Sequence, residues 1–248
     1  MCFISAPNIF DIMNAKRILA YLSDIAANNN REWFHEHHDE FEVCHKDFLD
    51  GVGQLIERLA KFDSEIAAVK PEDCVYRFYR DVRFSPDKSP YKRHFGAYIC
   101  SHGRKALRGG YYLHLQPGMC FFGIGCYWLP TNILTSVRNE IMGNIGEWRR
   151  VVENGKFINT FGYPNEGIFT EESRSEKGFG LAALKTCPKG FPKDYEFMKY
   201  LRMKDYLVWR ALGDDFSVDG KWLDRLAEYA QTAKPMMDFV NCVVDDYE

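Results

Sequence analysis

A chain of 248 residues lies near the upper limit that one hydrophobic core serves, and no Pro/Gly/Ser-rich linker divides it. With 46% apolar and 15% aromatic residues, the chain is too hydrophobic to be intrinsically disordered. A net charge of −3 argues against broad adhesion to nucleic acid or to anionic membranes. We therefore predict a single domain over residues 15–248, preceded by an N-terminal extension at residues 1–14.

The N-terminus and the cysteines indicate the compartment. The first residues, MCFISAPNIFDIMNAKR, contain no long apolar stretch and carry their charges after the apolar residues. That order matches neither a secretory signal nor a membrane span. The eight cysteines are scattered singly without a CxxC pair, which is typical of thiols in a reducing compartment. We therefore expect a cytoplasmic protein that has no membrane partner.

The N-terminal part of the domain has helical periodicity. Apolar residues recur at helical spacing between residues 18 and 26, which predicts a first helix that ends at Asn28-Asn29-Asn30. Asn29 and Glu32 have the spacing of a capping box, so a second helix is predicted from this point to Phe62.

From Cys74 the period changes from helical to alternating, which predicts a strand at residues 76–84. The following SPDKSP predicts an irregular loop, because proline cannot donate a ladder hydrogen bond. Short separations between the next apolar runs favour an antiparallel meander. These further predicted strands lie at residues 94–100, 109–116 and 119–128.

After Pro130 helical patterns return, in NILTSVRNEIM and in EWRRVVEN. A Gly-rich irregular stretch follows near residues 160–180, and two more helices are predicted at 194–212 and 220–241. Helices, then strands, then helices indicate an α+β fold. We predict an antiparallel meander sheet, at about residues 74–128, packed against N-terminal and C-terminal helices.

Positive charge is concentrated in one segment of this acidic chain. Residues 76–110 contain nine Lys or Arg residues against Asp81 and Asp87, so the segment carries +7 and the rest of the chain −10. A local cationic field of this kind favours a specific anionic ligand.

The alternation divides the arginines of this segment between two faces of the predicted strand. Arg77 and Arg83 share one face, and Arg80 falls among aromatic residues on the other. A guanidinium on an apolar face has to be paired, so Arg80 is either a structural ion pair or the floor of a pocket. Cationic, phenolic and carboxylate side chains that converge where strand meets loop suit a phosphate or carboxylate ligand. The predicted binding residues are Arg77, Arg80, Asp81, Arg83, Lys88, Tyr91 and Lys92.

The sequence leaves catalysis and the oligomeric state open. If the protein is also an enzyme, Asp87 or His114 is the candidate general base. A second hypothesis is nucleic-acid binding, in which the basic stretch follows phosphates and its aromatic residues stack on bases. A third is a structural or interaction domain whose arginines are consumed by internal ion pairs.

We expect neither a metal nor a cofactor. The run His35-Glu36-His37-His38 lacks the HExxH spacing, and a polar helix face explains it. Gly123-x-Gly125 has no third glycine and so does not match a dinucleotide-binding loop. No GxSxG elbow and no GxxxxGK[ST] loop is present.

Several segments resemble one uncharacterised family of bacterial and fungal proteins, domain of unknown function 2461. They are NNNREWF, YRFYRDVRFSPDKSPYK, GGYYLHLQPG, CPKGF and LRMKDYLVWR, and the resemblance covers roughly residues 15–242. The resemblance implies a stand-alone domain but supplies no reaction. This chain has histidines after the Trp-Phe pair, where the family tends to have Asn-Lys. By the resemblance, the hallmark positions are Arg77, Arg80, Asp81, Arg83, Phe84, Asp87, Lys88, Pro90, Tyr91 and Lys92.

Overall fold

The computed structural model describes residues 13–165 and 176–247. Most of the expected N-terminal extension at 1–14, and part of the expected irregular stretch near 160–180, therefore lie outside the described residues. The α-helices are α1 Ala15–Ala27, α2 Arg31–Glu36, α3 His38–Leu59, α4 Pro71–Cys74, α5 Thr131–Gly143, α6 Ile145–Val152, α7 Gly155–Phe161, α8 Met198–Leu201 and α9 Trp222–Val244. Short 3-10 helices lie at η1 Ser64–Ile66 and η2 Asp245–Tyr247.

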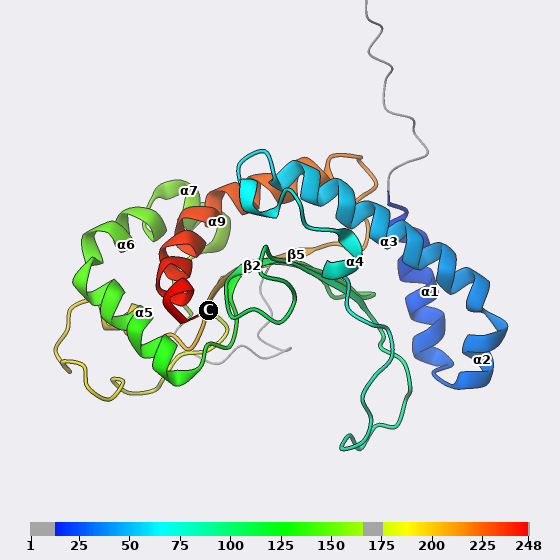
Figure 1. The fold of residues 1–248 in the computed structure, drawn as a ribbon, viewed down its shortest axis with the longest axis horizontal. Helices are drawn as coiled ribbons and strands as arrows, with labels where there is room; N and C mark the ends of the chain where they lie inside the picture. The colour runs from blue at the N-terminus through cyan, green and yellow to red at the C-terminus, as the bar shows by residue number, and fades with distance from the viewer. Residues whose placement is uncertain (1–12, 166–175, 248) are drawn as a thin grey trace, which may run out of the picture.

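The strands form one five-stranded antiparallel sheet in the order β1-β2-β3-β5-β4. They are β1 Phe95–Ile99, β2 Gly110–Leu115, β3 Cys120–Cys126, β4 Lys177–Phe179 and β5 Tyr206–Leu212. Helices α3 and α9 lie over one face of the sheet, and α1 and α2 flank it at one end (Figure 1). The α+β fold with a meander, β1-β2-β3, is thus confirmed. No helix among the described residues is both long and apolar enough to span a membrane.

Alternation along the strands sorts their side chains between the two faces of the sheet. Phe95 of β1 packs on Phe48 of α3 with ring centroids 5.3 Å apart. On β2, the Tyr111 hydroxyl donates to Asp63 Oδ2 just beyond α3, at 2.8 Å. In each strand, the residues next to these in the sequence therefore point to the other face, away from α3 and α9. We call this second side, which includes Tyr112 and His114, the opposite face.

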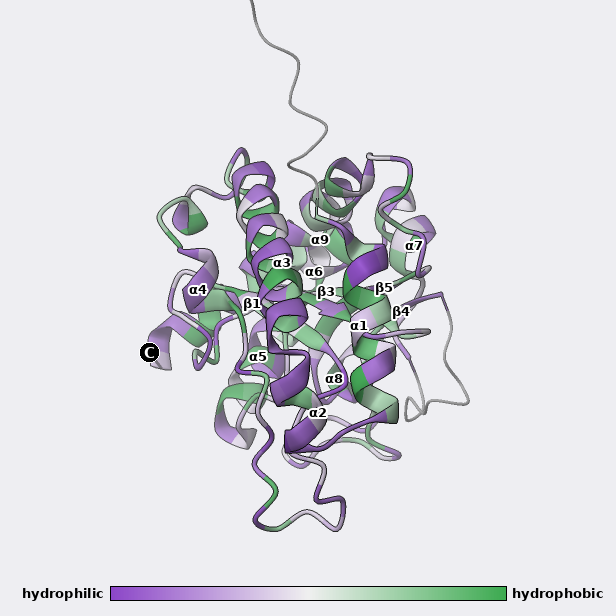
Figure 2. Ribbon diagram, turned by 90° about the vertical axis from the view of Figure 1, so that its right-hand side faces the viewer, coloured by the Kyte–Doolittle hydropathy of each residue, from purple (hydrophilic) through white to green (hydrophobic). Residues whose placement is uncertain are grey.

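The strand predicted at residues 76–84 is wrong. Residues 76–94, here called the arm, form two extended legs that leave the β1 edge and project beyond α2 (Figures 1 and 2). The backbones of the legs pair at an isolated bridge between Tyr79 and Tyr91, with Arg80 N donating to Pro90 O and Lys92 N to Phe78 O. Because Pro90 lacks an N–H, the returning leg cannot continue a regular ladder.

The helix predicted at residues 194–212 is also wrong. Only Met198–Leu201 is helical there, and Tyr206–Leu212 is strand β5, paired antiparallel with β3. Val208 of β5 is fully buried opposite Ile124. The run YLVWRAL is rich in residues that favour strands, and short apolar runs fit either periodicity. The predictions of helices after Pro130 and at residues 220–241 are confirmed by α5, α6 and α9.

The asparagine triplet ends one helix, starts another and holds the arm. The predicted capping role of Asn29 is wrong, because the N-cap of α2 is Asn30, which accepts a hydrogen bond from Trp33 N at 2.9 Å. Asn29 instead binds Tyr91 through both amide atoms: its Nδ2 donates to Tyr91 O, and Tyr91 N donates to its Oδ1, each at 3.0 Å. The predicted single second helix is divided at His37 into α2 and α3.

An aromatic cluster fixes the base of the arm against the helices. Tyr91 stacks on Phe34 of α2 with centroids 4.1 Å apart, and Phe78 lies 5.1 Å from Phe41 of α3. Phe78 and Tyr91 are both buried. Towards the tip this packing ends, since the side chain of Phe84 is 94% exposed. The arm therefore has an anchored base and a solvated tip.

We predict that Asn29→Ala lowers the free energy of unfolding by about 1–3 kcal/mol, because two hydrogen bonds between the helices and the arm are lost. Urea denaturation measures this loss, and hydrogen exchange at the Tyr91 amide should accelerate. Asn28→Ala is the matched control, because the Asn28 amide bonds only within its own helix, to Asp24 O. Equal losses in the two variants, with unchanged Tyr91 exchange, would contradict the role of Asn29.

Candidate anion-binding site

Arg80 is paired inside the arm. Its Nη1 donates to Asp87 Oδ2 at 2.7 Å and to Ser89 O at 3.1 Å, and its Nη2 lies 3.3 Å from Ser85 Oγ. Asp87 also accepts from Ser89 N at 2.9 Å and from Ser89 Oγ at 2.5 Å. The guanidinium of Arg80 thus belongs to a structural ion pair that is only partly buried, and the residue also lines a cavity.

The same contacts bear on Asp87 as a candidate base. The Ser89 hydroxyl and amide, together with Arg80, hold the pKa of the Asp87 carboxyl well below its usual range. A carboxylate whose charged form is so strongly favoured accepts a proton poorly at neutral pH. The geometry therefore gives Asp87 the role of organising the returning leg of the arm.

Two further basic residues of the arm tip are also engaged locally. Arg83 and Asp81 form a two-pronged pair, with Nε to Oδ1 at 2.9 Å and Nη2 to Oδ2 at 2.7 Å. Lys88 Nζ donates to the carbonyl of Val82 at 3.0 Å. These contacts close the turn of the tip; Asp81 neutralises Arg83, whereas the carbonyl holds the Lys88 ammonium without neutralising it.

Three other cations gather where the arm joins the sheet. Lys92 Nζ lies 5.3 Å from the centre of the Tyr76 ring, and Arg104 Cζ lies 6.0 Å from it. Arg104 comes from the connection between β1 and β2, and its guanidinium also donates to the carbonyl of Val75. Arg77, next to Tyr76, is the third cation, because its charge acts on Lys92. We call Arg77, Lys92 and Arg104 the cationic cluster.

The cationic cluster has little opposing charge; Arg77 does act on the Asp81 carboxylate, whose pKa is lowered mainly by Arg83 and then by Arg77. Burial lowers the pKa of Lys92, and the charges that lower it further are those of Arg77 and Arg104. Within residues 13–165 and 176–247, the ion pairs closer than 4.0 Å include none of these three side chains. The contrast with Arg80 and Arg83 is direct, since each of those has its own aspartate.

Two histidines and a tyrosine lie beside the cluster on the sheet. His94 stacks on His114 with ring centroids 4.5 Å apart, and His114 stacks in turn on Phe121 at 4.7 Å. The Tyr112 hydroxyl lies 2.9 Å from His114 Nδ1, and the Tyr112 ring meets that of Tyr76 edge-on at 6.3 Å. His114, a candidate base from the sequence, is 7% exposed and held by this stack.

A glycine makes room for this arrangement. Gly96 of β1 is paired with His114 of β2, and a Cβ at Gly96 would lie 2.8 Å from the Tyr112 hydroxyl. Any side chain at residue 96 would therefore push Tyr112 away from the opposite face. Charge also acts across this region, because burial and then Lys92 lower the pKa of His94 to about 4.

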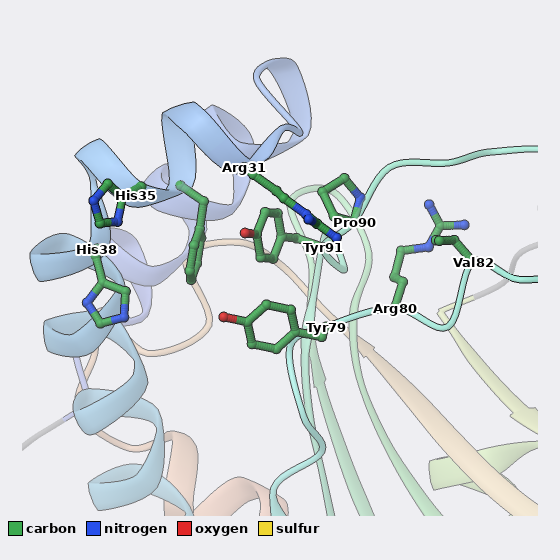
Figure 3. A pocket seen from close by; sticks show the side chains of 9 residues that line it. Arg31, His35, His38, Tyr79, Arg80, Val82, Pro90 and Tyr91 are labelled. Carbon is green, nitrogen blue, oxygen red and sulfur yellow. The ribbon is translucent and has the colours of Figure 1, made fainter.

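The residues predicted from the sequence do not meet in one place. Arg77 and Lys92 belong to the cationic cluster, whereas Asp81, Arg83 and Lys88 build the arm tip. Arg80 and Tyr91 line a separate cavity of about 510 Å³ between the arm and α2 (Figure 3). The sequence prediction omitted Tyr112 and Arg104 from the site. Arg104 is one of the nine cations of the basic segment. Its position at Tyr76 depends on the connection between β1 and β2, which the sequence pattern does not show.

Metal ligands do not cluster in the described part of the chain. Residues 13–165 and 176–247 contain no group of three or more His, Cys, Asp or Glu side chains that could hold a metal ion. Of the seven cysteines in these ranges, five have buried side chains.

We predict that His94 makes stability depend on pH. The unfolded chain takes up a proton at this histidine near its ordinary pKa of 6.5, whereas the folded protein does so only near pH 4. Stability therefore falls as the pH is lowered through this window, by about 2 kcal/mol between pH 7 and pH 5. His94→Gln should lose correspondingly less between these two values in urea titrations. The exposed His35→Gln should behave as wild type; an unchanged pH difference in His94→Gln would refute the prediction.

Comparison with known proteins gives a family. A family described as "Conserved hypothetical protein (DUF2461)" matches residues 17–239, and the chain belongs to it. Searches of curated proteins and of solved structures gave no significant match.

Proposed function

Because the description of the DUF2461 family names no reaction, we propose a function from the geometry: the protein binds a small phosphate- or carboxylate-bearing ligand at the cationic cluster. The observation that carries the proposal is that Lys92 and Arg104 lie over one tyrosine ring, that Arg77 acts on Lys92, and that none of the three has an ion pair closer than 4.0 Å among the described residues. Lys92 is partly buried beside two exposed arginines, and like charges near a partly buried ammonium cost free energy that a bound anion would offset.

The contacts that hold the cluster leave its charge available. Lys92 and Arg104 lie over the ring of Tyr76, and a cation–π contact positions a cation without neutralising it. An aspartate partner, such as the one Arg80 has, would instead satisfy the guanidinium and exclude a ligand. The chain thus separates its structural cations from those that we assign to binding.

Neutral hydrogen-bonding groups next to the cluster would complete the site. His94 is uncharged at neutral pH because its pKa is about 4, so it can donate one hydrogen bond and accept another. Burial is the larger cause of the low pKa of His94, and a ligand that neutralises Lys92 would remove the smaller cause, the Lys92 charge. Binding of an anion is therefore expected to be coupled to proton uptake as the pH falls towards 5.

We predict that Arg104→Gln weakens anion binding about tenfold or more, because one charge-assisted hydrogen bond is worth roughly 1.5–3 kcal/mol. Calorimetric titration of the full chain with inorganic phosphate, pyrophosphate and malonate measures this. Lys105→Gln is the matched control, since it removes the same charge from the next residue of the same connection. Saturable binding of at least one anion, weakened in Arg104→Gln but not in Lys105→Gln, is the expected result.

Other outcomes would separate the remaining hypotheses. Binding of none of the three anions would overturn the proposal and favour a structural or interaction domain. Tight binding of single-stranded oligonucleotides, with a log–log salt slope of about 0.7 per neutralised phosphate, would favour nucleic-acid binding instead. A small ligand that neutralises one or two charges gives a much shallower slope.

A further inference from the structure

A second region, separate from the cationic cluster, has the features of a binding site. It is the cavity of about 510 Å³ between α2, the start of α3 and the arm, a size usual for small-molecule sites. In Figure 3, the helices supply the histidine side and the arm supplies the tyrosine side. Residues more than forty positions apart in the sequence thus line one hollow.

Aromatic rings form one wall of this cavity. Phe34 and Tyr91 are stacked at 4.1 Å, and Tyr79 meets Phe34 edge-on at 6.0 Å and Tyr91 at 5.3 Å. Tyr79 is 54% exposed although it belongs to this cluster, so one ring of the cluster is left accessible. An accessible ring beside buried ones is a surface on which a planar group can pack.

The hydroxyl of a buried tyrosine reaches the same space. Tyr91 as a whole is 4% exposed and Asn29 binds its backbone, but its hydroxyl is not one of the fully buried polar atoms that lack a partner among the described residues, so it is accessible from the cavity. Figure 3 shows the hydroxyls of Tyr91 and Tyr79 on the side that faces His35 and His38. A hydroxyl at the surface of the cavity can donate a hydrogen bond to a ligand oxygen.

The charged side chains around the cavity are basic. Arg31, the first residue of α2, lies next to Pro90 and Tyr91 in Figure 3, and its charge lowers the pKa of Tyr91 against the larger effect of burial. His35 and His38 stand on the opposite side. None of the described residues that line the cavity is Asp or Glu, although Glu42 lies 3.7 Å from His38. Arg80 contributes its stem, because its guanidinium is bound to Asp87.

We propose that this cavity binds a small aromatic acid. The planar ring of the ligand packs on Tyr79 beside Phe34, and its acidic group pairs with Arg31. An oxygen of the ligand accepts a hydrogen bond from the Tyr91 hydroxyl. The histidines extend the basic side of the cavity. This site differs from the cationic cluster in chemistry as well as in place, since an aromatic wall is its main surface.

The experiment uses matched probes on the full chain. Indole-3-acetate carries both features, indole-3-acetamide lacks the charge, and cyclohexylacetate lacks the aromatic ring; benzoate and phenyl phosphate test smaller rings. Calorimetry gives the affinities, and the imidazole proton signals of His35 and His38, assigned with His35→Gln and His38→Gln, report the place of binding. We expect saturable binding of an aromatic acid, at least about tenfold tighter than the amide and the cyclohexyl acid.

Two variants connect the binding to the cavity. Arg31→Gln should reduce the affinity for the acid to that for the amide, and Tyr91→Phe, which keeps the stacked ring, should weaken binding about threefold to tenfold through loss of one hydrogen bond. Lys16→Gln, which removes an exposed charge from neighbouring α1, should bind as wild type. The proposal is overturned if no aromatic acid binds at roughly millimolar concentration. It is also overturned if the three matched probes bind alike, or if Arg31→Gln and Tyr91→Phe bind as wild type.

Discussion

The side-chain amide of Asn29 positions both candidate sites. It binds the backbone N–H and C=O of Tyr91 and thereby holds the arm against the turn between α1 and α2. An amide is suited to this because it offers one donor and one acceptor side by side, as a neighbouring strand would. With Tyr91 held, its ring closes the aromatic cluster on one side, and Lys92 is directed towards Tyr76 on the other.

The arm separates two uses of positive charge. Near the tip, each guanidinium has a carboxylate within a few residues, as Arg80 has Asp87 and Arg83 has Asp81, and these pairs give shape to a segment that lacks a ladder. Near the base, Lys92 meets other cations and an aromatic ring instead. Charge density alone does not distinguish these cases. The presence or absence of a nearby acid does, because it decides whether the field is cancelled or extends to a ligand.

The sequence predicted the elements whose pattern is long and regular, such as α9 and the strands β1 to β3, because burial of one face imposes a clear period. It failed where the outcome depends on a distant partner. Residues 76–84 alternate as a strand does, yet the facing leg contains Pro90 and offers few donors. The basic segment was identified correctly as a concentration of charge. Which of its cations are paired depends on a turn that returns Asp87 to Arg80. Arg104 is brought to Tyr76 by the connection between β1 and β2.

The spans of these contacts also imply an order of events during synthesis. The contacts that close the arm tip join residues two to nine positions apart, whereas the bonds of Asn29 to Tyr91 join residues 62 apart. Local closures form fast and cost little chain entropy. The tip can therefore fold as soon as it leaves the ribosome. The turn that contains Asn29 is synthesised earlier, but its amide has no partner in the arm until the arm packs against α1 and α2.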